Sequence, residues 1–236
     1  MKEKAIERHR LTFSEFLSAP VTVRAATQIV YFLAGLLCSR GIVFSKYAPF
    51  GVAAVAAAPF GNLVATLFGV IVGCLYPSAA TVPVHYIAAA LAAAAIRWTL
   101  NDLAKLKGHP VFAPMVAFAP VLATGIALSM VNGAMNIGVA MYVAEALLAA
   151  GGAYFFARTT QVANGSKGIT ALNQQELACV TITIGVLVLS LSKITVGTIS
   201  IGRVIAVIAI LFAARFIHYF FINAVHIRRT DFCKLF

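Results

Sequence analysis

The chain has 236 residues, of which 61% are hydrophobic and 11% are charged, and its mean hydropathy is +0.95. A soluble domain carries about 25% charged residues, so this composition excludes an ordinary soluble protein and indicates an integral membrane protein. The formal net charge of +11 fits loops that face anionic lipid headgroups better than it fits nucleic-acid binding, because the sequence contains no basic, aromatic-rich soluble module.

Three regions divide the chain. Residues 1–24 are a polar lead that we expect in the cytoplasm, and residues 217–236 are a basic and aromatic tail. Residues 25–216 form a transmembrane domain whose apolar runs are continuous, which favours helices over a β-barrel. We expect an all-α bundle of about six full spans plus one short helix pair, about eight membrane helices in total. The six spans are expected at roughly 25–44, 85–100, 111–131, 137–157, 176–192 and 203–216.

The first span contains Arg40 near its outer end, where the side chain is expected to reach into the headgroup layer. After it comes an uncharged stretch, Ala48–Leu75, in which the tetrapeptide Ala-Pro-Phe-Gly occurs twice. The stretch is too long for one span and too short for two, because a spanning helix needs about 20 apolar residues. We therefore expect two short helices joined by a turn at Pro59-Phe60-Gly61.

Glycines and prolines of this stretch are the expected packing and topology residues. Gly69-x-x-x-Gly73 is typical of a close helix contact, either within the chain or with another subunit. The full set predicted for helix packing and topology is Pro49, Gly51, Pro59, Gly61, Gly69 and Gly73.

Basic residues predict the sidedness of the chain. If the N-terminus is inside and the helix pair enters and leaves on one side, 14 of the 18 Lys and Arg lie inside. The four outside are then Arg40, Lys46, Lys193 and Arg203. A single crossing through the same stretch leaves 7 inside against 11 outside. The positive-inside rule therefore favours the even number of crossings.

Few polar side chains are expected within the membrane. Glu145 is the only acid well inside an expected span. It marks either an ion or proton path or a hydrogen-bonded carboxyl group that faces the bundle, and the second interpretation is the simpler one. Asn62 and Gln28 are expected to form interhelical hydrogen bonds.

No catalytic, cofactor-binding or metal-binding residues are predicted. The four cysteines are far apart in the sequence and form no Cys-x-x-Cys or Cys/His cluster. The sequence also lacks a phosphate-binding loop, a dinucleotide fingerprint, a zinc-protease motif and a nucleophile elbow. We therefore expect no cofactor.

Several short sequence segments, and their order along the chain, resemble those of a known protein family. A basic lead and one helix precede Tyr-Ala-Pro-Phe-Gly-Val-Ala at 47–53. Further on, Ala-Leu-Asn-Gln-Gln-Glu at 171–176 opens one apolar span, and the segment 203–215 forms the next. In this order the chain resembles the membrane region of stage II sporulation protein E, a bacterial sporulation phosphatase, over roughly residues 1–216. Residues 217–236 depart from the pattern.

The resemblance implies a multi-pass anchor in the bacterial cell membrane, located at the polar division septum. Full-length relatives carry a PPM-type serine/threonine phosphatase domain that dephosphorylates an anti-anti-sigma factor and so activates the forespore sigma factor. That domain does not occur in these 236 residues, so we expect this polypeptide to have no phosphatase activity. The partners that the resemblance implies are the tubulin-like division protein and other septal proteins. Composition and the small-residue helices add the lipid bilayer and a second copy of the chain as expected partners.

One alternative remains open at this stage. The substrate-binding membrane subunit of a vitamin importer is also small, basic and alanine-rich, and a broken helix can line a transport pocket. Such a subunit should have a polar pocket between helices near Glu145 or Asn62, whereas an anchor should have a packed apolar interior. A membrane enzyme is the least expected class, because so few acids are present.

Overall fold

The computed structural model describes residues 20–43, 47–75, 83–102, 109–131, 137–165, 172–192, 195–196, 199–208 and 210–211. The named helices are α2 (Pro20–Cys38), α3 (Phe50–Ala57), η1 (Phe60–Asn62), α4 (Leu63–Leu75), α5 (Pro83–Thr99), η2 (Leu100–Asp102), α7 (Phe112–Val131), α8 (Ile137–Asn164) and α9 (Gln174–Leu191). Two strands of two residues each, β1 (Thr195–Val196) and β2 (Ile199–Ser200), pair antiparallel. Residues 201–208 and 210–211 are helical.

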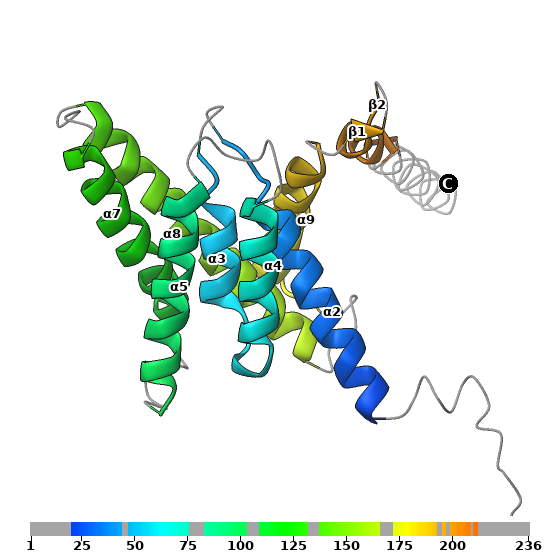
Figure 1. The fold of residues 1–236 in the computed structure, drawn as a ribbon. Coiled ribbons are helices and arrows are strands. Elements are labelled where there is room, and N and C mark those ends of the chain that lie inside the picture. The colour runs from blue at the N-terminus through cyan, green and yellow to red at the C-terminus, as the bar shows by residue number, and fades with distance from the viewer. Residues whose placement is uncertain are drawn as a thin grey trace, which may run out of the picture.

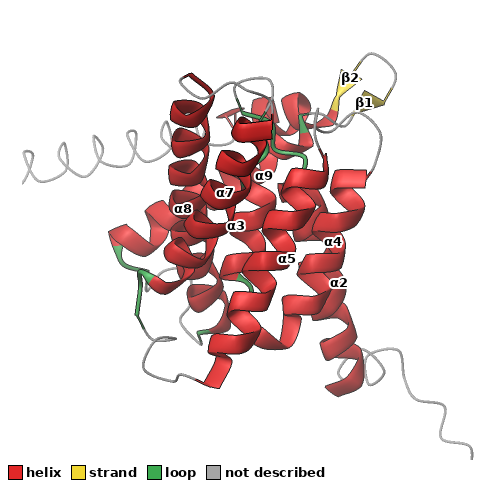
Figure 2. Ribbon diagram, turned by 60° about the vertical axis from the view of Figure 1, so that its left-hand side comes forward, coloured by secondary structure: helices red, strands yellow, loops and turns green. Residues whose placement is uncertain are grey.

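The short helix α3 lies at the centre of a helical bundle (Figure 1). It contacts α2, α4, α5, α7 and α8, and all eight of its residues are buried. Helix α9 packs on α8 and α2 (Figure 2). A helix that is apolar on every side is stable only inside other elements, and α3 has the sequence Phe-Gly-Val-Ala-Ala-Val-Ala-Ala. The fold is therefore built around the first half of the uncharged stretch.

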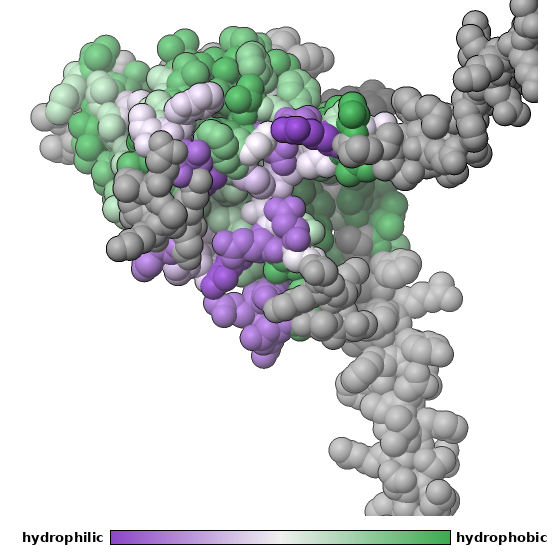
Figure 3. All heavy atoms as spheres, turned by 90° about the horizontal axis from the view of Figure 1, so that it is seen from below, coloured by the Kyte–Doolittle hydropathy of each residue, from purple (hydrophilic) through white to green (hydrophobic). Residues whose placement is uncertain are grey.

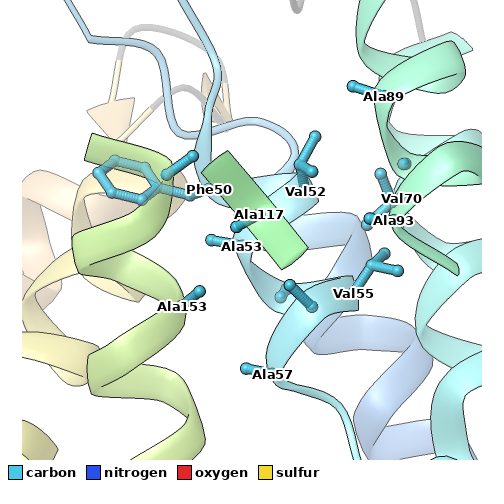
Figure 4. Packing of buried hydrophobic residues seen from close by; sticks show 14 of the residues in the cluster. Phe50, Val52, Ala53, Val55, Ala57, Val70, Ala89, Ala93, Ala117 and Ala153 are labelled. Atoms are coloured by element: carbon cyan, nitrogen blue, oxygen red, sulfur yellow. The ribbon is translucent and has the colours of Figure 1, made fainter. Parts of the chain in front are cut away.

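Small side chains allow the surrounding helices to approach α3 closely. Alanines on three neighbouring helices are less than 1% exposed: Ala89, Ala90 and Ala93 on α5, Ala117 on α7, and Ala146, Ala149 and Ala153 on α8. Figure 4 shows several of them around the Val52, Ala53 and Val55 side chains of α3. Where lipid surrounds a protein, association between helices depends on such close contact, because lipid tails solvate leucine as well as a protein interior does.

Helices α3 and α4 run in opposite directions, and the turn between them lies at the end of the bundle where α2 begins (Figure 1). Two contacts fix this arrangement: Gln28, in the first half of α2, bonds to Gly61, and Arg97, near the end of α5, bonds to Ala58. The uncharged stretch thus starts and ends at the same end of the bundle. On which side of a membrane that end lies stays a prediction.

The structure has four helices long and apolar enough to cross a membrane among its described residues: Val21–Cys38, Phe112–Val131, Gly138–Asn164 and Gln174–Leu191. Six full spans were expected. Helix α5 has 17 residues and is roughly 25 Å long, which is less than the roughly 30 Å of a hydrocarbon core. The sixth expected span, 203–216, lies partly outside the described residues.

Several expected boundaries are wrong. Helix α2 begins at Pro20, five residues inside the predicted lead, because proline is well suited to the first turn of a helix. Helix α8 continues to Asn164, since the segment after Ala157 is polar but contains no glycine or proline before Gly165. The strand pair lies between the expected spans 176–192 and 203–216. Residues 1–19 of the lead and the tail at 217–236 lie outside the described residues.

Arg40 also differs from its expected position. Its side chain is only 8% exposed, so it lies within the protein rather than reaching outward. The reason is that α2 ends at Cys38, six residues earlier than expected, and the chain then turns over the bundle toward α3.

Candidate functional site

The break between α3 and α4, together with the polar side chains that hold both ends of α3, is the most specific polar arrangement in the described part of the chain. Proline imposes the break. A residue before proline is pushed into an extended conformation, and Ala58 has ψ 139° before Pro59 with ψ 146°. The last carbonyl groups of α3 then have no partner within their own helix. A buried carbonyl group left without a donor costs about 1 to 3 kcal/mol.

Arg97 of α5 supplies these donors. Its Nη1 donates to the Ala56 carbonyl oxygen at 2.6 Å, and its Nη2 donates to the Ala58 carbonyl oxygen. The guanidinium carbon also lies 5.8 Å from the centre of the Phe112 ring. A cation at a helix C-terminus is favoured by the helix dipole as well as by the hydrogen bonds. Arg97 therefore caps the C-terminal end of α3.

Gln28 and Asn62 lie on the other side of the same turn. The Gln28 side chain donates through Nε2 to the Gly61 carbonyl oxygen at 2.7 Å, so the interhelical bond expected for Gln28 is confirmed. The Asn62 side chain lies within hydrogen-bonding reach of the Tyr31 side chain of α2, in line with the interhelical contact expected for it. Its backbone N–H donates to the Pro59 carbonyl oxygen at 2.9 Å, and its carbonyl oxygen accepts from the Thr66 hydroxyl group at 2.9 Å. The turn is thus held from both α2 and α5.

The N-terminal end of α3 is held by a second chain of hydrogen bonds. The Ala48 N–H donates to the Tyr86 hydroxyl oxygen at 3.0 Å, and the Tyr86 hydroxyl group donates to Glu145 Oε1 at 2.6 Å. Glu145 is 1% exposed and Tyr86 is 3% exposed. Glu145 is therefore a buried carboxyl group that joins α8 to α5 and, through Tyr86, to the chain entering α3.

Aromatic rings surround this carboxyl group. The His85 ring centre lies 4.3 Å from that of Tyr86 and 5.9 Å from that of Tyr142, and Tyr142 makes an edge contact with Tyr47 at 5.9 Å. These contacts fill the space between the N-terminal ends of α3 and α5 and the first turns of α8. Their effect is to enclose Glu145.

Both ends of α3 are held by the same face of α5. Tyr86 and Arg97 are eleven residues apart, which is about three turns of an α-helix, so their side chains leave α5 in the same direction. Between them on that face lie Ala89, Ala90 and Ala93, each less than 1% exposed. The α5 sequence thus places a hydroxyl group, a flat alanine surface and a guanidinium group along the length of α3.

The predicted glycines have distinct surroundings. A Cβ atom at Gly69 would overlap the Phe32 carbonyl oxygen, and one at Gly73 would overlap the Ser39 hydroxyl group. Gly35 of α2 faces the Thr66 carbonyl oxygen of α4 at a similarly short distance. The Gly69-x-x-x-Gly73 motif therefore contacts α2 of the same chain, and close backbone approach requires glycine on both helices.

The two remaining predicted glycines differ from each other. A Cβ atom at Gly51 would lie 3.0 Å from the Ser39 Cα atom and 3.2 Å from a Val70 methyl group. A Cβ atom at Gly61 would meet nothing within 4 Å. Pro49 precedes α3 as its N-cap residue and is fully buried, whereas Pro59 lies in the break.

Sequence reasoning did not identify Arg97 or Tyr86 as important residues. The available signal was their position in a segment made almost entirely of alanine, where an arginine and a tyrosine three turns apart are conspicuous. It also missed the helix start at Asn173. Its side chain accepts from the Gln174 N–H at 2.7 Å, and Glu176 accepts from the Asn173 N–H at 3.0 Å, which is a capping box.

Comparison with known proteins identifies the family. Within the described residues, no group of three or more His, Cys, Asp or Glu side chains could hold a metal ion. No curated protein and no solved structure gives a significant match. A family model described as the SpoIIE N-terminal domain matches residues 2–217. A match of this extent covers the lead and the whole bundle, and the chain belongs to the SpoIIE N-terminal domain family.

Proposed function

We propose that this chain anchors a sporulation serine/threonine phosphatase in the bacterial cell membrane and localises it at the polar division septum. The family match supports a membrane region of a sporulation phosphatase. The four helices of membrane-spanning length support insertion in a bilayer. The observation that carries the proposal is the interior: all eight residues of α3 are buried, and alanine side chains of α5, α7 and α8 surround them.

The resemblance to full-length relatives supplies the wider role. In those relatives the phosphatase domain acts on an anti-anti-sigma factor, and this releases the forespore sigma factor. The role proposed for the bundle is to position that activity in space. Its proposed partners are the bilayer, a second copy of the chain and the tubulin-like division protein.

Outward-facing apolar side chains support insertion and lateral association. Helices α2 and α4 have large side chains that are at least 40% exposed: Ile29, Val30 and Leu33 on α2, and Val64, Phe68, Val72 and Leu75 on α4. Such faces are stable against lipid or another membrane helix.

The importer subunit has no observation in its favour. It requires a polar pocket between helices near Glu145 or Asn62. Glu145 is instead enclosed by Tyr86 and its aromatic neighbours. A polar cavity of about 210 Å³ does exist at the end of the bundle near Pro59, but neither Glu145 nor Asn62 lines it.

A fluorescent fusion tests the localisation. The 236-residue chain, joined to a fluorescent protein, is expressed in a sporulating bacterium that lacks its own copy of this membrane region. We expect fluorescence concentrated at the polar septum. An even distribution around the cell membrane would show that the chain anchors without localising.

Cysteine labelling tests the sidedness separately. In a variant without the four native cysteines, single cysteines replace Lys46 and Lys105 in turn. A membrane-impermeant maleimide should label position 46 in intact cells, and position 105 only after permeabilisation. The reverse pattern would overturn the even number of crossings.

A further inference from the structure

We propose that the end of the bundle that holds the α3–α4 turn binds one anionic phospholipid, with its phosphate group in a basic cavity and an acyl chain in a groove between α5 and α7. The proposal rests on the chain lying in a bilayer, which is part of the proposed function. It does not depend on localisation at the septum.

The cavity for the headgroup is polar and basic. It has a volume of about 210 Å³ and lies among the α3–α4 turn, the end of α5, the start of α7 and the last turns of α8. Among the described residues, those that line it include no aspartate or glutamate, and the polar ones are Arg97, His109, Tyr154, Arg158, Thr160, Gln161 and Asn164. Two arginines without an acid among the lining residues favour an anion.

Both arginines have more N–H groups than their hydrogen bonds within the protein use, and the others can donate to a ligand. A guanidinium group has five N–H donors. The hydrogen bonds of Arg97 go to Ala56 and Ala58, and that of Arg158 goes to Gln161 at 3.2 Å. Because Arg97 is fixed by α3, part of the cavity is organised before any ligand binds. Arg158 is exposed, so it can adjust to the ligand.

The groove for the acyl chain is apolar. It has a volume of about 450 Å³ and is lined by Ile96, Leu100, Val111, Met115, Val116 and Ala119, together with His109 and Phe112. Phe112 and Ala119 are seven residues apart on α7, which corresponds to roughly 10 Å along the helix axis. The groove thus extends from the end of the bundle toward its apolar middle.

The two spaces meet at His109 and Phe112, which line both. Arg97 lies two residues before the end of α5, and His109 lies three residues before the start of α7. Figure 3, a view onto this end, shows hydrophilic side chains gathered there and hydrophobic side chains around them. A basic cavity at the end of a bundle, joined to an apolar groove along its side, matches the two chemical halves of an anionic lipid.

Charge and shape together select this occupant. A free phosphate ion would use the arginines and leave the groove empty. A second copy of the chain could cover the groove, but it would need an acidic group for the cavity, and acids are rare in this sequence, with seven in 236 residues. An anionic lipid satisfies both spaces, and a bilayer supplies it at high local concentration.

Native mass spectrometry tests the proposal. The full chain is reconstituted in nanodiscs that contain equal amounts of phosphatidylcholine and phosphatidylglycerol. The chain is then released from the nanodiscs in the mass spectrometer, and the lipid that stays bound to it is identified. We expect one phosphatidylglycerol per chain in preference to phosphatidylcholine. Arg158→Gln should lower that preference about fivefold, the effect of one basic residue near an anionic surface. Met115→Trp, which fills the groove, should also lower it.

Two matched variants serve as controls. Arg24→Gln removes an exposed arginine of α2 at the same end that does not line the cavity, and Met130→Trp changes an exposed methionine of α7 that does not line the groove. Both should bind lipid like the original chain. Equal lipid preference in all five proteins would overturn the proposal.

Two further outcomes would also overturn it. One is binding of inorganic phosphate in phosphatidylcholine nanodiscs that Arg158→Gln weakens while Met115→Trp does not. The other is a dimer that Met115→Trp converts to a monomer without a change in bound lipid. Failure of the chain to enter nanodiscs at all would instead refute the membrane region itself, so the two failures are distinguishable.

Discussion

The two copies of Ala-Pro-Phe-Gly have the same four residues and opposite surroundings. In the first copy Phe50 is 7% exposed and Gly51 is in tight contact with Ser39. In the second copy Phe60 is 42% exposed, beside Trp98, and Gly61 has open space around it. The first copy starts a helix at the centre of the bundle, and the second breaks the chain at its end.

This difference shows that the local sequence determines the backbone conformation of each copy, whereas the neighbouring helices determine how much each residue contributes to stability. Proline acts in both copies by restricting its own φ and the residue before it. What surrounds each copy depends on helices elsewhere in the chain. The following substitutions test this contrast. In each case stability is the free energy of unfolding in mixed detergent micelles, and circular dichroism monitors the unfolding.

The largest contrast is expected for the two phenylalanines. Phe50→Ala should destabilise the chain by about 3 to 5 kcal/mol, because it leaves a cavity against Gly152 and Gly41. Phe60→Ala should cost about 1 kcal/mol, the contribution of its aromatic contact with Trp98. Equal losses would show that the burial of the first copy does not matter.

Arg97→Leu should be the next most damaging change. It leaves the carbonyl groups of Ala56 and Ala58 without donors, at a cost of roughly 2 to 4 kcal/mol in total. Arg97→Lys should restore part of this, since an ammonium group can reach one carbonyl group but lacks the planar fork. Arg24→Leu, on an exposed arginine, is the control and should have little effect. An Arg97→Leu protein as stable as this control would remove the role assigned to the arginine.

The two glycines should differ by less. Gly51→Ala should cost about 1 to 3 kcal/mol, because its Cβ atom meets the Ser39 backbone. Gly61→Ala should be neutral or stabilise the chain by up to about 1 kcal/mol, because the added methyl group meets nothing and the unfolded chain loses freedom. A destabilising Gly61→Ala would contradict the open surroundings of the second copy.

The smallest effect is expected for Gln28→Leu. It removes the side-chain bond to the Gly61 carbonyl oxygen, which is worth at most about 1 kcal/mol in a membrane protein. Thr27→Val, whose hydroxyl group bonds only within its own helix, serves as the comparison. If the two variants were equally stable, Arg97 alone would hold the turn.

Local rules explain what the sequence predicted. The helix break at Pro59 follows from the geometry of proline, and most helices of the bundle follow from apolar runs of the right length. The extension of α8 to Asn164 was missed because polarity was taken as the sign of a loop, although Arg158 and Gln161 are good helix formers. Polar residues end a membrane segment without necessarily ending the helix.

The hydrogen bonds that hold α3 depend on distance in sequence. Arg97 meets Ala56 across 41 residues, and Tyr86 meets Glu145 across 59 residues. No periodicity or spacing within one helix specifies such partners. Glu145 was noticed because a buried acid is costly in an apolar segment, but its partner Tyr86 could be assigned only once α5 and α8 were placed side by side.

The distance between Tyr86 and Arg97 along α5 matches the length of the segment that contains α3. From Ala48 to Ala58 the chain advances ten residues, roughly 15 Å, and the eleven residues of α5 advance roughly 16 Å. One residue inserted between Tyr86 and Arg97 would rotate one of them away by about 100°. Insertions or deletions in either helix must therefore be matched in the other, and we expect length variation in this family to accumulate in helices outside this pair.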